Sequence, residues 1–280
     1  LINTGLNDEQ KKFVEIMQSS GDNLLTIINQ ILDLSKIESQ KFELDVHDFN
    51  LHVAMYDIIE MLAVKAGKKD LAFNFTIGND VPCSLRGDSG RIRQVVLNLS
   101  YNAIKFTEKG SVNVNVIVVN ESETEVRLKF EINDTGIGIP EEHMKDLFVP
   151  FMQVDGGMNR KYGGTGLGLS ISSSLVKLLG SEIVLESRIG IGSRFYFTLE
   201  AGVSIKRTMR DSFASCRGLS ACIVSSLPDD LVLLNVEYYL QSLGIDINFI
   251  QSTEKCGDFS CDIFIVINSK MIMDELRSNP

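Results

Sequence analysis

Two asparagines and a lysine fall on one face of a predicted helix, which Asp88 caps and which runs to about Phe106. Asn98 and Asn102 are four residues apart and Lys105 lies one turn further on, so the three side chains project in the same direction. Amide oxygens suit Mg²⁺, which keeps several waters and binds substrate phosphates, and a lysine adds a point charge against a phosphate. A solvated polar helix face explains the same trio when it is taken alone.

A second segment follows directly after a predicted strand and runs from Asp134 to Pro140. A carboxylate at a strand end can accept a hydrogen bond from an exocyclic amine, and Gly136 and Gly138 permit the close approach of a flat ring. An ordinary glycine-rich turn is the alternative. The segment is not a dinucleotide-binding fingerprint, because the third glycine and the βαβ context are absent.

A third segment is rich in glycine and opens a predicted helix at about 167–179; it comprises Gly163, Gly164, Thr165, Gly166, Leu167 and Gly168. Backbone N–H groups at a helix N-terminus form an anion site for phosphates. The spacing is not that of a P-loop, since no Gly-Lys-Ser/Thr follows. Arg160 and Lys161 lie just upstream, where they can reach a phosphate chain, although plain surface charge is the alternative.

The N-terminal stretch lies outside these three segments and is predicted to be helical. Asn7, with Gln10 three residues later, predicts the start of a long helix. Apolar residues then recur at alternating spacings of four and three, broken only by Ser20: Phe13, Met17, Leu24, Ile27, Ile31 and Leu34. This is the seam of a coiled coil or helical bundle. A lone helix cannot bury it, so we expect a partner helix upstream of Leu1.

The middle of the chain predicts an α+β fold, a two-layer α/β sandwich with an antiparallel-leaning sheet covered on one face by helices. Alternation at Phe42, Leu44 and Val46 predicts a first strand, and a helical pattern follows from Val53 to Leu62. The remaining strands are expected at 71–77, 112–118, 126–132, 182–187 and 194–200. The paired alternations at 112–118 and 126–132 predict a hairpin.

The C-terminal part predicts a separate unit. Residues 202–217 are polar and basic, as in a linker. Strands at 221–224, 245–250 and 263–267 around a helix at 229–243 favour a parallel sheet, and the chain stops at Pro280 before a doubly wound domain is complete. We therefore expect a truncated α/β unit here.

Composition excludes several function classes. The 280 residues carry a formal charge of −10, which is poorly suited to nucleic acid and to anionic lipid. No apolar run approaches the length of a membrane span, and no signal-peptide pattern opens the chain. Five cysteines without a CxxC motif predict reduced thiols and a cytoplasmic location, and their spacing does not favour zinc.

Taken in order, the three segments resemble the N, G1 and G2 boxes of sensor histidine kinases, whose ATP-binding domain has the Bergerat (GHKL) fold. Phe148 and Phe151 stand where the family has its F box. The resemblance continues through residues 187–195. It also includes the first helix, where 20–25 and 31–38 look like the second dimerisation helix of hybrid kinases.

The resemblance implies ATP and Mg²⁺ as cofactors. Asn98 and Asn102 would hold Mg²⁺, Lys105 would contact phosphate, and Asp134 would read the adenine amine beside Gly136 and Gly138. The remaining implied ATP-binding residues shape or flank a mobile lid: Phe148, Phe151, Arg160, Lys161, Gly164, Thr165, Gly166, Leu167 and Gly168. For the two phenylalanines, plain core packing is at least as good an explanation.

The resemblance favours a kinase. Related ATPases place a water-activating Glu where this chain has Asn98, and an amide cannot take a proton from water at neutral pH. We expect the catalytic core of a histidine kinase that transfers the γ-phosphate of ATP to a histidine upstream of this chain, because His47, His52 and His143 lie in no phosphoacceptor motif. An ATP-binding scaffold without phosphotransfer and a GHKL ATPase remain as alternatives.

The resemblance also implies a domain order. Residues 1–40 are expected to be a dimerisation helix, 41–201 the ATP-binding domain, 202–217 a linker and 218–280 part of a receiver-like domain. The receiver is degenerate, because Ser225 and Ser226 stand where receivers carry an acidic pair. The implied partners are a second copy of the chain through complete dimerisation helices, and a response-regulator receiver or phosphotransfer protein.

Overall fold

The computed structural model describes residues 6–39, 42–152 and 166–208, and in the C-terminal part residues 211, 214–225, 236–237, 239–241, 243–250 and 261–267. One long helix, α1 (Asp8–Glu38), opens the chain. It begins with the predicted capping box: Gln10 N–H donates to Asn7 Oδ1 at 2.8 Å, and Asn7 N–H donates to Gln10 Oε1 at 3.0 Å.

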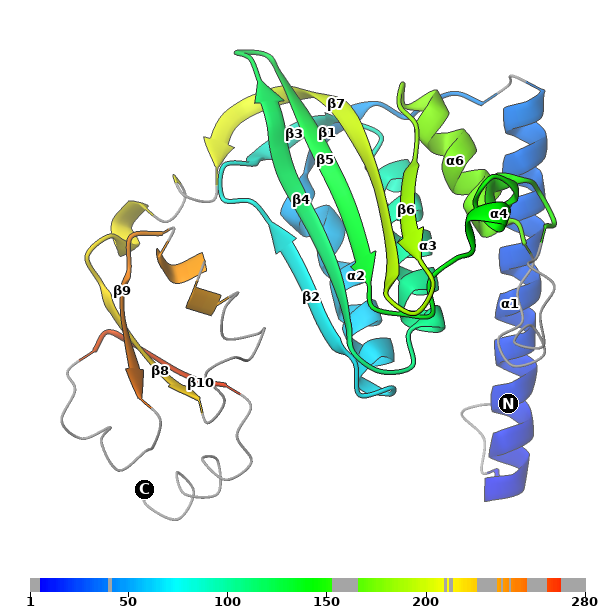
Figure 1. Cartoon of the computed structure of the whole chain (residues 1–280), viewed down its shortest axis with the longest axis horizontal. Helices are drawn as coiled ribbons and strands as arrows, with labels where there is room; N and C mark the ends of the chain where they lie inside the picture. Colours follow the sequence, from blue (N-terminus) through cyan, green and yellow to red (C-terminus); the bar gives the residue numbers. More distant parts are fainter. Residues whose placement is uncertain are drawn as a thin grey trace.

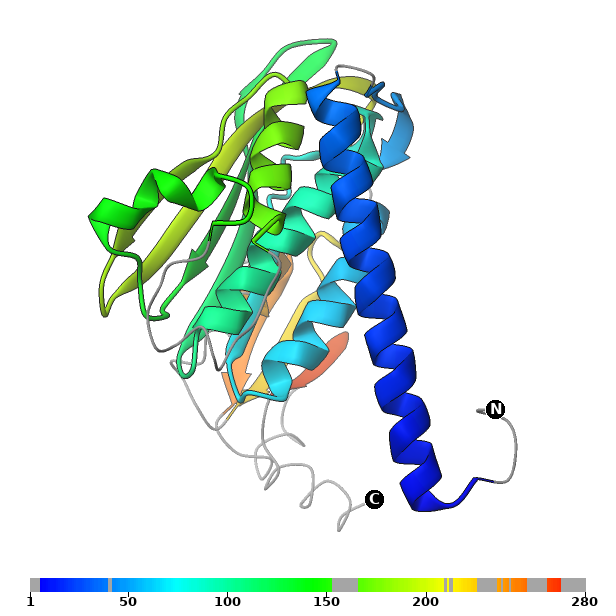
Figure 2. The same cartoon turned by 90° about the vertical axis from the view of Figure 1, so that its right-hand side faces the viewer.

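Most of α1 stands clear of the rest of the fold, as the two cartoon views show (Figures 1 and 2). The seam residues Phe13, Met17 and Leu24 are each more than half exposed. Among the described side chains of α1, those that pack against the main core are Leu34 and Ile37, in the C-terminal turns. The predicted helix is therefore confirmed, and much of its apolar seam is open to a partner.

A mixed seven-stranded sheet forms the first layer of the central domain. Its strands are β1 (His47–Asn50), β2 (Ala72–Ile77), β3 (Pro82–Gly87), β4 (Ser111–Glu121), β5 (Glu125–Asp134), β6 (Val184–Arg188) and β7 (Gly192–Thr208). The order is β1-β3-β7-β5-β4-β2, with β6 also on β7. Among the described strand pairs of this sheet, β2 with β4 is the parallel one, and the others are antiparallel.

Helices form the second layer, on one face of this sheet (Figure 1). They are α2 (Leu51–Gly67), α3 (Ser89–Phe106) and α6 (Gly168–Leu178), with the short α4 (Glu141–Met144) and a 3₁₀ turn η1 (Asp146–Phe148) between β5 and α6. Alternate residues of β4 and β5 face them and are fully buried, and Phe130 stacks on Phe197 with ring centroids 5.1 Å apart. This is the predicted α+β sandwich, and its core fixes the helices that carry the candidate site.

Two predictions in this domain are wrong. Residues 42–46 form no strand: Asp45 N–H donates to Asp88 Oδ2 at 3.0 Å, and the Phe42 ring lies 4.5 Å from the Arg91 guanidinium. Phe42 and the backbone of Asp45 therefore dock this connection onto the start of α3. Residues 202–208 are not linker, because β7 continues through them and pairs with β3.

The C-terminal part contains a 3₁₀ turn η2 (Ala214–Cys216) and a small sheet of β8 (Ser220–Ser225), β9 (Asp246–Ile250) and β10 (Ile263–Ile267). The order is β10-β8-β9 and both pairs are parallel, which confirms the predicted parallel arrangement. Within the described ranges, no helix is both long and apolar enough to cross a bilayer.

Candidate functional site

Helix α3 carries the asparagine and lysine group. Asp88 caps its start, with Oδ1 accepting the Arg91 N–H at 3.0 Å. Its apolar side is buried in the core: Ile92, Val95, Val96, Leu99, Ala103 and Ile104. Asn98, Asn102 and Lys105 are partly exposed, so the helix has a buried apolar side and a second side with three polar groups in reach of a ligand.

The amide of Asn98 is held between α3 and α6. Its Nδ2 donates to Ser172 Oγ, 2.8 Å away on α6. A Cβ at Gly168 would collide with Asn98 Oδ1, so the amide oxygen faces the first residue of α6, and a side chain there would displace it. The structure therefore brings together a residue of the first segment and a glycine of the third.

Asp134 ends β5 and turns into the second segment. Its Oδ1 accepts the Gly136 N–H at 2.8 Å. Burial raises the pKa of the Asp134 carboxyl, while hydrogen bonds from the backbone N–H groups of Gly136 and Ser193 act in the opposite direction. These donors hold the partly buried carboxylate in one orientation.

The second segment is packed against the end of α3. A Cβ at Gly136 would lie 2.6 Å from the carbonyl oxygen of Phe106, and the Ile137 N–H lies 3.4 Å from the same oxygen. Only a glycine lets the loop approach so closely. The loop after Asp134 is therefore packed directly against the C-terminal end of the asparagine helix.

The connection between β6 and β7 braces the other side of this loop. Gly138 has a φ of +70°, and a Cβ on it would collide with the backbone carbonyl of Arg188. Ile139 N–H donates to Ser187 Oγ at 2.9 Å, and Gly190 N–H donates to Ile137 O at 2.8 Å. The loop is thus fixed from both sides.

The two predicted aromatic residues have different surroundings. Phe148, in η1, packs against the main core, as the core alternative expected. Phe151 is 65% exposed with a φ of 64°, and its N–H donates to Gly166 O at 3.1 Å. Leu167 is buried just before α6, so the start of this helix is anchored in the core.

Four predicted residues, Arg160, Lys161, Gly164 and Thr165, lie outside the described residues. Lys105 is described: burial lowers its pKa, and its Nζ lies 4.8 Å from the Phe106 ring centroid. Among the described residues, no group of three or more His, Cys, Asp or Glu is placed to hold a metal ion. A magnesium ion held by amide oxygens, waters and phosphates needs no such group.

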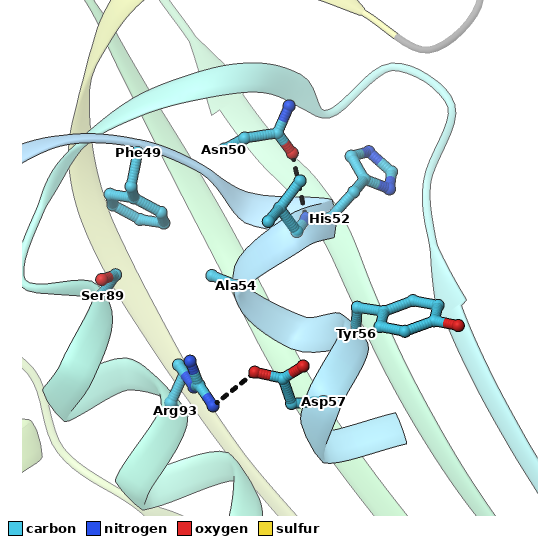
Figure 3. A pocket seen from close by; sticks show the side chains of 9 residues that line it. Phe49, Asn50, His52, Ala54, Tyr56, Asp57, Ser89 and Arg93 are labelled. Carbon is cyan, nitrogen blue, oxygen red and sulfur yellow. Dashed lines mark hydrogen bonds and ion pairs between the residues drawn. The ribbon is translucent and has the colours of Figure 1, made fainter. Parts of the chain in front are cut away.

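A separate hollow of about 640 Å³ lies at the opposite end of α3 (Figure 3). His52 and Tyr56 of α2 line it on one side, and Phe49 and Arg93 line it on the other. Arg93 forms an ion pair with Asp57 of α2 at 3.2 Å. The hollow adjoins the first turns of α2 and α3 and contains none of the predicted site residues, so it is distinct from the site at the helix ends.

Sequence reasoning missed residues that support the site. Ser172 fixes Asn98, and Ser187 fixes the loop after Asp134. The spacing of Ser172 behind the glycines, one turn into α6, is the only local signal for the first. Ser187 lies in the stretch that resembles the family, but no chemistry of its own distinguished it.

Two family models match the chain. Residues 87–203 match the family described as "Histidine kinase-, DNA gyrase B-, and HSP90-like ATPase". Residues 1–40 match the "His Kinase A (phospho-acceptor) domain". The first match contains α3, Asp134 and the start of α6, and the second contains α1.

The curated relatives that match the chain are histidine kinases or sensor proteins by name. "Hybrid signal transduction histidine kinase B" of Dictyostelium discoideum is 40% identical over 71% of this chain and 10% of its own length. "Sensor protein GacS" of Pseudomonas syringae pv. syringae is 36% identical over 86% of this chain and 26% of its own length. The chain thus spans a small part of these relatives.

A solved structure shares the fold. Full-length ShkA in complex with AMPPNP superposes with a TM-score of 0.71 at 24% identity, over 95% of this chain and 54% of that one. The two family matches together span more than half of the sequence, and they indicate the same family as the curated relatives. The chain belongs to the sensor histidine kinases and contains the histidine kinase catalytic core, whose ATPase-type domain implies ATP binding.

Proposed function

We propose that this core binds Mg·ATP in the space bounded by α3, the loop after Asp134 and the first turn of α6. The observation that carries the proposal is that both other elements contact α3: α6 meets it at Asn98 through Ser172 and Gly168, and the loop after Asp134 meets it at the Phe106 carbonyl through Gly136. The Asp134 carboxylate accepts the adenine amine, while Gly136 and Gly138 leave room for the ring. The N–H groups at the start of α6 face the phosphates.

The metal is proposed on the chemistry of the donors. Asn98 Nδ2 is engaged by Ser172, which leaves the amide oxygen as the group available for a cation, and Asn102 lies one turn further along α3. When bound, Mg²⁺ supplies positive charge that offsets the charge of the phosphates. Lys105 adds a second positive group, and its lowered pKa reflects a partly desolvated ammonium.

The proposed reaction is transfer of the γ-phosphate to a histidine outside this sequence. None of His47, His52 and His143 lies on α1, which matches the phosphoacceptor domain family. The oxygen that bridged the β- and γ-phosphates leaves with ADP, and the imidazole nitrogen forms the new bond to phosphorus. Catalysis of phosphoryl transfer comes mainly from positioning and electrostatic stabilisation, and the chain's own donors contribute to both.

The test compares magnesium-dependent ATP binding in the wild type, Asn98→Ala and Asn102→Ala by calorimetry, with and without EDTA. We expect the wild type to bind much more tightly with Mg²⁺, and both variants to lose most of that difference. Equal affinities with and without the metal in a folded wild type would remove the magnesium proposal.

The two alternatives are separated by chemistry. An amide at Asn98 has no base to activate water, so we expect no phosphate release from ATP by the chain alone. Steady release would favour an ATPase. Binding of ATP, with no phosphorylation of a histidine-bearing phosphoacceptor segment supplied in trans, would favour a scaffold.

The flanking parts complete the proposal. The exposed seam of α1 packs against a second copy of the chain, and the phosphoryl group passes on to a response-regulator receiver or phosphotransfer protein. We assign residues 218–280 to a degenerate receiver-like unit with a docking role; the parallel order β10-β8-β9 supports this. The expected location of this core is the cytoplasm, where ATP is available.

A further inference from the structure

Lys69 occupies a rigid turn between α2 and β2. Its N–H donates to Ala66 O at 2.9 Å, and the Leu71 N–H donates to the same oxygen at 3.1 Å. The intervening Asp70 has a φ of 57°, the left-handed conformation that closes the turn. The backbone therefore fixes where the partly buried Lys69 side chain begins.

The Lys69 ammonium caps the C-terminus of α3. Its Nζ donates to the carbonyl oxygens of Ile104 and Lys105, each at 2.7 Å, and of Thr107 at 3.1 Å. The last turn of a helix leaves carbonyls without intrahelical partners, and a cation there also opposes the helix dipole. One side chain thus satisfies three acceptors with a full positive charge.

The remaining acceptors at this helix end are satisfied from other directions. Ala103 O accepts both the N–H and the hydroxyl of the buried Thr107, at 3.1 and 2.8 Å. Phe106 O faces Gly136 and Ile137 of the loop after Asp134. The end of α3 is therefore held by Lys69 on one side and by the adenine loop on the other.

This helix end is part of the candidate nucleotide site. Lys105 lies within it, and the Phe106 carbonyl forms the surface on which Gly136 packs. If the last turn of α3 loosens, the phosphate-facing ammonium of Lys105 and the support beneath the adenine loop are disturbed together. Lys69 contacts the backbone carbonyls at the end of α3, so any effect on this site is exerted through that backbone.

We propose that Lys69 is a positioning residue for nucleotide binding, which holds the last turn of α3 so that Lys105 and the loop after Asp134 keep their relative placement. The inference rests on the proposed ATP site. It adds a residue from outside the asparagine and glycine segments, in a turn that no motif of the sequence singles out.

The test uses three variants of the whole chain. Lys69→Met removes the charge and the donors at similar length, Lys69→Arg keeps the charge and donors in a planar fork, and Lys68→Met removes the neighbouring exposed lysine as a control. Calorimetry measures affinity for Mg·ATP and for adenosine, and thermal unfolding establishes that each variant is folded at the temperature used.

We expect Lys69→Met to weaken both ligands by about tenfold, the scale of charge-assisted hydrogen bonds. We expect Lys69→Arg to weaken both ligands by about threefold, since its planar fork cannot match the three carbonyls as an ammonium does. Lys68→Met should keep both affinities within about twofold of the wild type. Adenosine is the decisive probe, because it has no phosphates for a distant cation to attract.

Three results would overturn the proposal. A lower unfolding temperature with unchanged affinities would make Lys69 a stability residue only. Weaker ATP but unchanged adenosine binding would show an effect of charge alone. If Lys69→Met does not fold, Lys69→Arg decides, and wild-type affinity for adenosine in that variant would exclude positioning. Failure of the wild type to bind ATP is a separate outcome, which removes the proposed function itself.

Discussion

Asn98 on α3 and Ser172 on α6 are joined by a 2.8 Å hydrogen bond in which the amide nitrogen donates to the hydroxyl oxygen. The bond connects two elements that are 74 residues apart in the sequence, and Ser172 is almost fully buried. It decides which end of the Asn98 amide faces the site. The oxygen is presented toward Gly168, so the orientation of the proposed metal ligand depends on a buried serine of α6.

Replacing Ser172 with alanine should therefore loosen Asn98. The loss of one buried hydrogen bond corresponds to about 1 kcal/mol of unfolding free energy, measurable by urea denaturation. The magnesium-dependent gain in ATP affinity should fall as well, because the amide can rotate. Ser174→Ala, on the same helix, gains the same helix propensity and should leave both quantities near wild type; equal effects of the two variants would contradict this role of Ser172.

Glu131 makes a pH-dependent contribution to stability. Burial by itself would raise its pKa, but hydrogen bonds from Arg194, Asn133 and Lys129 lower the pKa to about 2. Because the folded value lies below the unfolded one, the stabilisation is present above about pH 4.5 and is lost as the pH falls toward 2.

We expect Glu131→Gln to lose about 1–2 kcal/mol at pH 7 and to flatten the decline in stability at acid pH. Denaturant unfolding at a series of pH values measures this. The control is Glu200→Gln, because Glu200 pairs with Arg127 on the same sheet while more than half exposed. A loss of stability as large for Glu200→Gln as for Glu131→Gln would contradict the claim that the less exposed, hydrogen-bonded setting of Glu131 causes its effect.

The C-terminal half of α1 is tied to the central domain by Asp33. Its carboxylate lies 3.4 Å from Arg91 Nη1 and accepts from Gln94 Nε2 at 3.1 Å, and its side chain is 18% exposed. Asp33→Ala should free the end of α1, and amide exchange over residues 31–38 should rise about fivefold. Asp8→Ala removes the exposed Asp8–Lys11 pair and should change nothing there, and ATP affinity should stay constant in both.

The seam of α1 should drive association of this chain. Leu24 is 58% exposed at the middle of the seam, and a charge there is incompatible with a helix–helix interface. Sedimentation should show concentration-dependent association of the wild type that Leu24→Glu abolishes, while Gln18→Glu, off the seam, does not. A wild-type chain that stays monomeric at tens of micromolar would contradict the dimerisation proposal.

Local signals allowed the helices of the site to be predicted. Asp88 before an amphipathic run gave the start of α3, and the alternation of valines gave the β4–β5 hairpin. Phe42, Leu44 and Val46 misled, because an alternating pattern does not by itself supply a strand to pair with, and Val46 is half exposed. Here the backbone N–H of Asp45 bonds to the Asp88 side chain instead of a neighbouring strand.

Long-range contacts could not be predicted in this way. Nothing near Lys69 in the sequence indicates that its ammonium reaches carbonyls about 35 residues away, and β3 begins with a proline, which lowers the strand signal. The continuation of β7 to Thr208 depends on β3 as its partner. Each of these features is decided by a partner far away in the chain.

The most direct test of the account is the affinity for Mg·ATP of the wild type, Asp134→Asn and Asp146→Asn, measured by calorimetry. The account predicts that the wild type binds, that Asp134→Asn weakens binding by about tenfold or more because an amide is a poorer acceptor for the adenine amine, and that Asp146→Asn, an exposed acid in η1, binds as the wild type does. A folded wild-type chain that does not bind Mg·ATP, or an Asp134→Asn variant that binds it equally well, would contradict the account.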